Sequence, residues 1–147
     1  MFAIGEVYLG YNRKVKAKDA ALVTTSDRAA EVLRSVWDGN TMNLRESFKV
    51  LLLTRNHRAI NVYHHSEGGV SGTVSDIRLI MQSALLANAS GIILAHNHPS
   101  GNKRPSDADI TVTNKLKEAA KFFDINVLDH VILTDDEYLS YADEGLL

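Results

Sequence analysis

The residues best able to do chemistry in this sequence follow an apolar run, residues 91–95. Two histidines, His96 and His98, close the run, and Asp107 and Asp109 come soon after them. Residues i and i+2 of an extended chain point to the same side, so both imidazoles are expected to face one point. Neutral imidazole is the commonest side-chain metal ligand, and either aspartate can add a carboxylate oxygen. Two histidines and one carboxylate, with a fourth position for water, are typical of a catalytic zinc site.

The same residues could instead have a purely structural role. A pair of histidines on a surface is usually just solvated. Ser106, followed three positions later by Asp109, is close to a capping box at the start of a helix. The two roles are compatible, because a cap fixes the direction in which the aspartate points. The strand end, the tight turn and the acids that follow it favour the metal.

Hydrolysis at such a site would also need a base outside the metal's ligands, to take a proton from the bound water. Glu31 and Glu118 lie mid-helix and are expected to be solvated, and Glu67 lies by a glycine-rich connection. Glu46 begins the most apolar strand, a costly place for an unpartnered charge, so it ranks first. The alternative is that Glu46 simply faces water at the mouth of the strand. Ser106 could donate its hydroxyl to an oxyanion.

Composition limits the class of protein. The chain has 147 residues, 45% of them hydrophobic and 23% charged, as in an ordinary globular domain. No run approaches the roughly 18 apolar residues of a membrane span, and no signal peptide is seen, so a cytoplasmic location is expected. Without cysteine, any metal must be held by nitrogen and oxygen. The net charge of -2 gives no overall footprint for nucleic acid, and Lys14, Lys16 and Lys18 are expected to form a polar strand face.

Apolar periodicity predicts a single α/β domain with a mixed sheet flanked by helices. Helices are expected to begin at caps Ser26, Ser75 and Ser106. Strands are expected over 46–54 and 59–65 as a hairpin, then over 91–95, 126–133 and 138–141, with parallel pairing between 91–95 and 126–133. A further hairpin is expected within 6–18. The pairs Gly68-Gly69 and Ser71-Gly72 are expected to form a connection that lines the site.

Several common catalytic motifs are missing from the sequence. It lacks the P-C-x-x-C of zinc deaminases, the H-E-x-x-H helix and the G-x-x-x-x-G-K-[ST] phosphate loop. The pattern that is present, E…H-x-H-x(7)-S-x-x-D, resembles the JAMM motif of the MPN/JAB-domain zinc metalloproteases. The run H-N-H-P-S-G-N-K-R-P-S-D-A-D, with V-L-D-H-V-I-L after the next helix, is similar to the RadC branch of that family.

The resemblance implies an MPN/JAB-type, cytidine deaminase-like fold and assigns a role to each motif residue. Zinc would be held by His96, His98 and Asp109, which selects Asp109 over Asp107. Glu46 would be the acid-base residue and Ser106 the hydrogen-bond donor to the transition state. The same stretch contains His130, interpreted as a core residue or as a partner of a ligand rather than a ligand.

The match covers about residues 26–147, leaving residues 1–25 as an N-terminal extension. RadC proteins carry a DNA-binding helix-hairpin-helix region, and residues 1–25 show no such pattern. The leading hypothesis is therefore a zinc-dependent peptidase or isopeptidase acting on a peptide or protein substrate. The alternatives are a DNA-repair-associated factor, which the charge does not support, and a non-catalytic interaction module.

Overall fold

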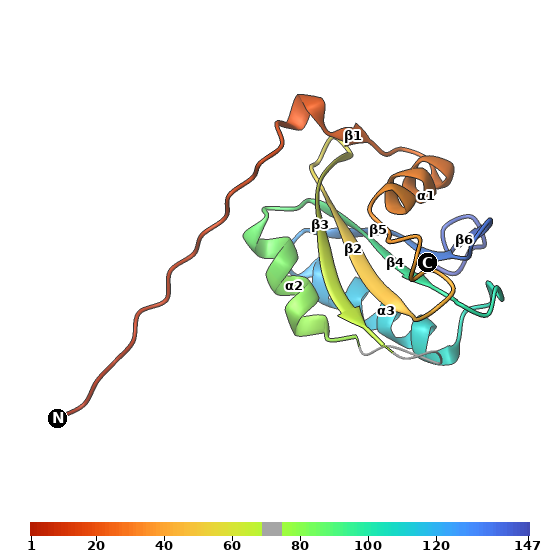
Figure 1. Cartoon of the computed structure of the whole chain (residues 1–147). Coiled ribbons are helices and arrows are strands. Elements are labelled where there is room, and N and C mark those ends of the chain that lie inside the picture. Colours follow the sequence, from red (N-terminus) through yellow and green to blue (C-terminus); the bar gives the residue numbers. More distant parts are fainter. Residues whose placement is uncertain (69–74) are drawn as a thin grey trace.

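A six-stranded mixed sheet forms the centre of the chain in a computed structural model, which describes residues 1–68 and 75–147 (Figure 1). The strand order is β1-β3-β2-β4-β5-β6. The strands are β1 (Ala21–Leu22), β2 (Ser47–Leu53), β3 (Arg58–Glu67), β4 (Gly91–Asn97), β5 (Asn126–Leu133) and β6 (Tyr138–Ser140). The predicted α/β domain with a mixed sheet is confirmed.

Pairing around β4 places the histidine-containing strand in the middle of the sheet. β4 is antiparallel to β2 and parallel to β5, and β2 forms the expected antiparallel hairpin with β3. Every residue of β2 and β4 is buried, as expected of strands covered on both faces. His96 lies opposite Phe48 on one side and Ile132 on the other. The backbone of His96 is therefore held from both sides.

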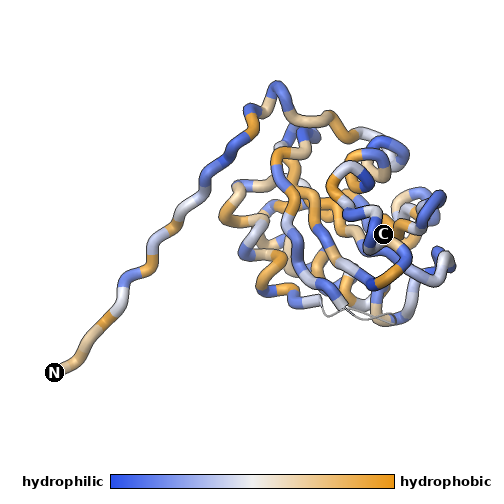
Figure 2. Tube along the Cα trace, in the orientation of Figure 1, coloured by the Kyte–Doolittle hydropathy of each residue, from blue (hydrophilic) through white to orange (hydrophobic). Residues whose placement is uncertain are grey.

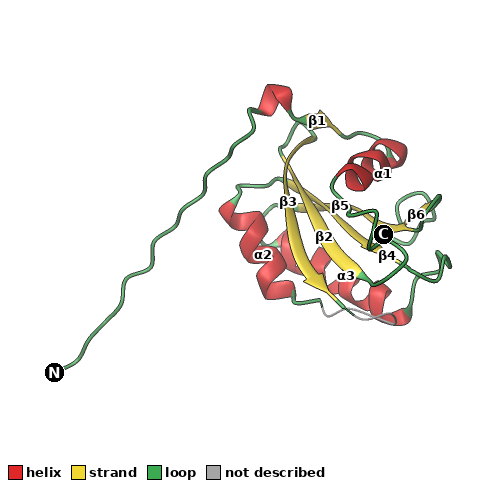
Figure 3. Ribbon diagram, in the orientation of Figure 1, coloured by secondary structure: helices red, strands yellow, loops and turns green. Residues whose placement is uncertain are grey.

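Helices cover both faces of the sheet (Figure 3). α1 (Ser26–Ser35) packs on one face, with Trp37 and Met42 beside it, while α2 (Ile77–Leu86) and α3 (Asp107–Lys121) pack on the other. A short 3-10 helix, η1 (Ala17–Asp19), precedes β1. Among the described residues, no helix is both long and apolar enough to cross a membrane.

Side-chain caps set where the helices begin. Ser106 caps α3 as predicted, in a complete capping box with Asp109. The caps predicted for the other two helices were wrong by one residue, because Thr25 caps α1 and Asp76 caps α2. In both cases two residues able to cap stand side by side, and the sequence alone cannot decide between them.

The hairpin predicted within 6–18 was wrong. Residues 1–16 form no strand and leave the domain as an extended arm (Figure 2). Val7 and Leu9 within it are more than four-fifths exposed. A two-stranded hairpin is marginal without a third partner to bury its apolar side, and the apolar side chains of Val7 and Leu9 stay largely exposed here. Of the predicted Gly68–Gly72 connection, all but Gly68 lies outside the described residues.

Candidate metal centre

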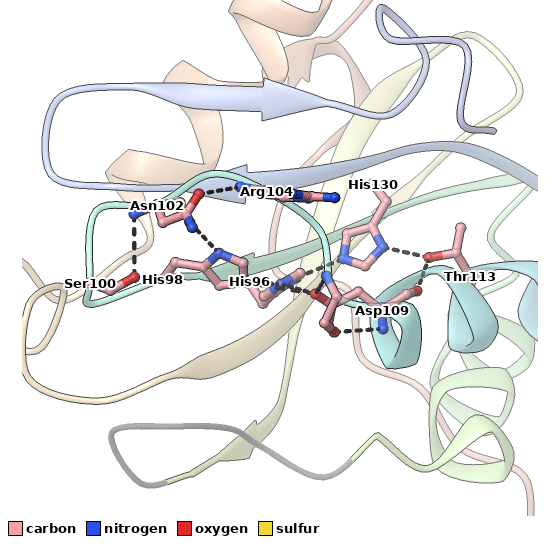
Figure 4. A network of polar contacts seen from close by, with 9 residues as sticks. His96, His98, Ser100, Asn102, Arg104, Asp109, Thr113 and His130 are labelled. Carbon is pink, nitrogen blue, oxygen red and sulfur yellow. Dashed lines mark hydrogen bonds and ion pairs between the residues drawn. The ribbon is translucent and has the colours of Figure 1, made fainter.

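His96 and His98 converge where β4 ends. His96 is fully buried within the strand, and its imidazole lies parallel to the ring of Phe48, with 6.0 Å between centroids. His98 follows the strand, and its backbone N–H donates to the carbonyl of Leu133 on β5. The Nε2 atoms of the two imidazoles are 2.9 Å apart (Figure 4). The i, i+2 spacing thus brings two nitrogen donors to one point, as the sequence predicted.

The loop after His98 orients that ring. Its Nδ1 is 2.6 Å from the carbonyl oxygen of Asn102, which can only accept, so Nδ1 carries the proton. Its Nε2 is then the unprotonated nitrogen and faces His96 and Asp109. The contact with Asp109 raises the pKa of His98, partly against the effect of burial. Protons therefore compete with a metal for this nitrogen.

Asp109 supplies the carboxylate from the first turn of α3. Its Oδ2 lies 3.4 Å from Nε2 of His96 and 3.8 Å from Nε2 of His98. The same oxygen accepts from the backbone N–H of Ser106 at 2.8 Å, so the capping box holds it in place. Burial works to raise the pKa of Asp109, but the two imidazoles outweigh it and hold the pKa well below its usual range. Asp107, the other candidate from the sequence, is exposed.

Glu46 stands beside the two histidines, directly before β2. A carboxylate oxygen of Glu46 and one ring nitrogen from each of His96 and His98 all lie within 4.8 Å of one another. Burial raises the pKa of Glu46, and the histidines lower it by less. This separation suits either a third ligand or a base that reaches a bound water. The other three candidate glutamates are engaged in ion pairs elsewhere, Glu31 with Arg28, Glu67 with Arg45 and Glu118 with Lys121.

Ser106 caps α3 through its hydroxyl oxygen, and its hydroxyl proton is not used in the cap. Its Oγ accepts from the backbone N–H of Asp109 at 3.1 Å. A hydroxyl can accept and donate at once, so the proton on Oγ is not used by the cap. Ser106 therefore lies beside Asp109, the candidate carboxylate ligand, with a hydroxyl proton free to donate.

The donor set fits zinc. Zinc takes imidazole nitrogen and carboxylate oxygen at about 2.0–2.2 Å, and a tetrahedral angle would set two such nitrogens about 3.3 Å apart. Two imidazole nitrogens at 2.9 Å, with a carboxylate oxygen within 3.8 Å of both, are close to that arrangement. A small outward shift of the rings would admit the ion.

A family model described as the RadC-like JAB domain matches residues 23–146. The chain belongs to this family. Among its relatives, the UPF0758 protein of Porphyromonas gingivalis is 49% identical over 104 residues, 70% of this chain and 46% of that protein. The UPF0758 protein of Flavobacterium johnsoniae is 44% identical over 101 residues, 69% of this chain and 44% of its own length. The UPF0758 protein of Clostridium acetobutylicum is 32% identical across 100% of this chain and 62% of its own.

This RadC-like JAB domain spans about half the length of the curated relatives it matches. The names of these relatives state no reaction, so the chemistry has to be inferred from the site itself. A cavity of about 360 Å³ opens beside Asp109, between the starts of α2 and α3, and is lined in part by Ile77, Val112 and Lys115.

Three residues that shape the site escaped the sequence analysis. Phe48 lies in the strand predicted over 46–54, Thr113 in the helix predicted to begin at Ser106, and Asn102 in the stretch between His98 and that helix. Thr113 is one helical turn after Asp109, a spacing that could have suggested a shared face toward the site. The carbonyl of Asn102 acts through its backbone, which no residue type reveals.

Proposed function

We propose that this RadC-like JAB domain is a zinc-dependent hydrolase that cleaves peptide or isopeptide bonds. One observation carries the proposal. His96, His98 and Asp109, which come from a strand end and a helix start, present three donor atoms to one point, with Glu46 beside them. Three protein ligands with an open fourth position are typical of catalytic zinc sites.

The role of each group in the proposed hydrolysis follows from its position in the site. A bound divalent ion supplies a Lewis acid and a water whose pKa is lowered toward neutrality. The carboxylate of Glu46 accepts the proton of the attacking water and returns it to the nitrogen of the leaving amine. Burial raises the pKa of Glu46, which makes its carboxylate a stronger base and its acid form easier to keep. The Oγ–H of Ser106 donates to the oxyanion that develops on the attacked carbonyl.

Replacing Glu46 with glutamine tests the assignment. Glu46→Gln should bind one zinc per chain with near wild-type affinity and lose at least 100-fold in kcat/KM. Zinc is measured by elemental analysis, and turnover with a fluorogenic peptide library and a set of lysine ε-linked dipeptides. Glu67→Gln, at a glutamate paired with Arg45, is the matched control and should retain activity. Wild-type turnover by Glu46→Gln would remove Glu46 as the base, and zinc-loaded wild type that cleaves no probe would count against the hydrolase.

A second candidate has an observation of its own. Glu46 is close enough to His96 and His98 to ligate the ion. Together with Asp109 it would close a four-ligand shell, which is typical of structural zinc. The ion would then brace the domain as an interaction module. Under this alternative, Glu46→Gln should lose much of its zinc affinity and its thermal stability together. If the domain is a hydrolase with Glu46 as the base, the same variant should keep both.

A further inference from the structure

Behind His96, on the side away from Asp109's carboxylate, a chain of buried polar groups runs into α3. Nδ1 of His96 is 2.8 Å from Nε2 of His130, and Nδ1 of His130 is 2.6 Å from Oγ1 of Thr113 (Figure 4). Oγ1 of Thr113 is in turn 2.8 Å from the backbone carbonyl of Asp109. All three side chains are buried, with 1% exposure or less. The chain therefore starts at one proposed ligand and ends at the backbone of another.

The direction of each hydrogen bond in this series can be assigned starting from Thr113. The structure gives the hydroxyl of Thr113 as the donor to the backbone carbonyl of Asp109, an oxygen that can only accept. Oγ1 of Thr113 must then accept from His130, which places a proton on Nδ1 of His130. We call this series of hydrogen bonds, from the carbonyl of Asp109 through Thr113 and His130 to His96, the ladder. Its first acceptor is a backbone carbonyl, which cannot become a donor.

The proton on Nδ1 of His130 also decides the direction of its hydrogen bond with His96. His130 is fully buried among Phe48, Tyr141 and His96, and no carboxylate contacts its ring in the described part of the chain, so burial favours its neutral form. A neutral imidazole with its proton on Nδ1 has an acceptor at Nε2. His96 must therefore donate from Nδ1, and its own Nε2 keeps a free lone pair toward His98 and Asp109.

We propose that Thr113 and His130 are positioning residues which lock His96 in the Nδ1–H tautomer and so hold its Nε2 ready for the metal. This inference deepens the proposed zinc site and rests on it. His98 obtains the same tautomer separately, from the carbonyl of Asn102. The two ligands are therefore oriented by independent devices, one inside the core and one in a loop.

Substitutions on α3 separate this role from mere packing. Thr113→Val keeps the shape of the side chain but removes the acceptor for His130, so we expect zinc affinity to fall about 10- to 100-fold. Thr113→Ser restores the hydroxyl and should bind zinc within about threefold of wild type. Thr111→Val, the same exchange at an exposed position of α3, is the control and should leave zinc affinity unchanged. Affinity is measured by competition with a chromophoric chelator, and folding by circular dichroism.

A direct readout of the tautomer needs neither zinc nor turnover. In metal-free protein with 15N-labelled histidine, long-range 1H–15N spectra should show His96 protonated at Nδ1 in wild type and Thr113→Ser. Thr113→Val and His130→Phe, which retains a ring against Tyr141, should show a mixture of tautomers or the Nε2–H form.

The two proposals can fail separately. The tautomer and zinc measurements are repeated on Glu46→Gln, which lacks the proposed base but leaves the ladder intact. Normal tautomers and zinc binding in an inactive wild type would leave the ladder standing and remove the hydrolase. A wild-type His96 protonated at Nε2, or a folded Thr113→Val with unchanged zinc affinity and tautomer, would overturn the ladder.

Discussion

The Nε2 atoms of His96 and His98 lie 2.9 Å apart, and hydrogen bonds on the far side of each ring leave both as acceptors. Two lone pairs at that distance repel unless a proton or a cation lies between them. A bound divalent ion should therefore stabilise the whole domain as well as complete the site.

Zinc is expected to raise the free energy of unfolding by about 2.7 kcal/mol when its free concentration is 100 times Kd. Calorimetry with and without a chelator measures the effect. His98→Ala should abolish most of the zinc-dependent shift in Tm, since one ligand is gone. His57→Asn is the control, because His57 is an exposed histidine with a positive φ that asparagine tolerates. An equal zinc shift in His98→Ala would contradict the proposed ligand set.

The pH dependence of activity should report the raised pKa of Glu46. A general base acts only when deprotonated, so kcat/KM falls as pH drops through this pKa. Because burial raises it, the acid limb should lie above 4.5, the ordinary value for glutamate. The profile is measured with zinc held saturating at every pH, which separates this limb from loss of the metal. An acid limb at or below 4.5 would argue against Glu46 as the base.

Ser106 can be tested against another helix cap. Ser106→Ala removes the cap of α3 and should cost about 1 kcal/mol of stability, together with a 10- to 100-fold loss in kcat from the missing donor. Thr25→Ala removes the cap of α1 at a similar cost. Thr25 lies away from the histidines, so its variant should keep wild-type kcat. Equal activity in the two variants, once both are folded, would reduce Ser106 to a cap.

Lys49 is a buried charge on the face of the sheet opposite the metal centre. It is 8% exposed, its Nζ lies 2.7 Å from Nδ1 of His64 and 5.0 Å from the ring centre of Trp37, and burial lowers its pKa. Lys49→Met should stabilise the domain at pH 8 by about 1 kcal/mol, because the desolvated charge is removed. Lys115→Met, at an exposed site, should change stability by less than about 0.5 kcal/mol.

The sign of the Lys49 effect with pH is fixed by its pKa. Between the lowered folded value and 10.5, the unfolded chain holds the extra proton, so wild-type stability rises with pH. The advantage of Lys49→Met should therefore shrink as pH rises toward 10.5. Urea unfolding at pH 8 and pH 9.5 measures it, and an advantage that grows with pH would refute the account.

Much of the fold could be predicted from the sequence because its central strands are strongly apolar. The runs 46–54, 91–95 and 126–133 each became a strand within a few residues of the predicted bounds. The failures were local. The alternating pattern of residues 6–18 formed no strand, and for two helices the cap was the neighbour of the predicted residue. Period and propensity describe one segment at a time, whereas these outcomes depend on what a segment touches.

Within the site, residue types and spacing predicted which side chains lie together better than they predicted the groups that surround them. Spacing alone left Asp107 and Asp109 open, and the structure places Asp109 beside the two histidines because its carboxylate closes the α3 cap. His130 was expected to be a core residue or a ligand's partner, and it contacts His96. Thr113 was not predicted: its spacing from Asp109 could have placed it on the same helix face, but its hydrogen bond to the backbone carbonyl of Asp109 is not visible in the residue types.

The central place of β4 has a consequence for how the ion would come and go. His96 is clamped between two neighbouring strands, whereas His98 and Asp109 flank the short turn of residues 99–105. Opening that turn would release two ligands at once while the sheet stays whole. Release and rebinding of the ion should then be faster than unfolding by orders of magnitude. Backbone amides of residues 99–105 should exchange with deuterium long before those of residues 92–97. The domain could shed and regain its ion many times within one folded lifetime.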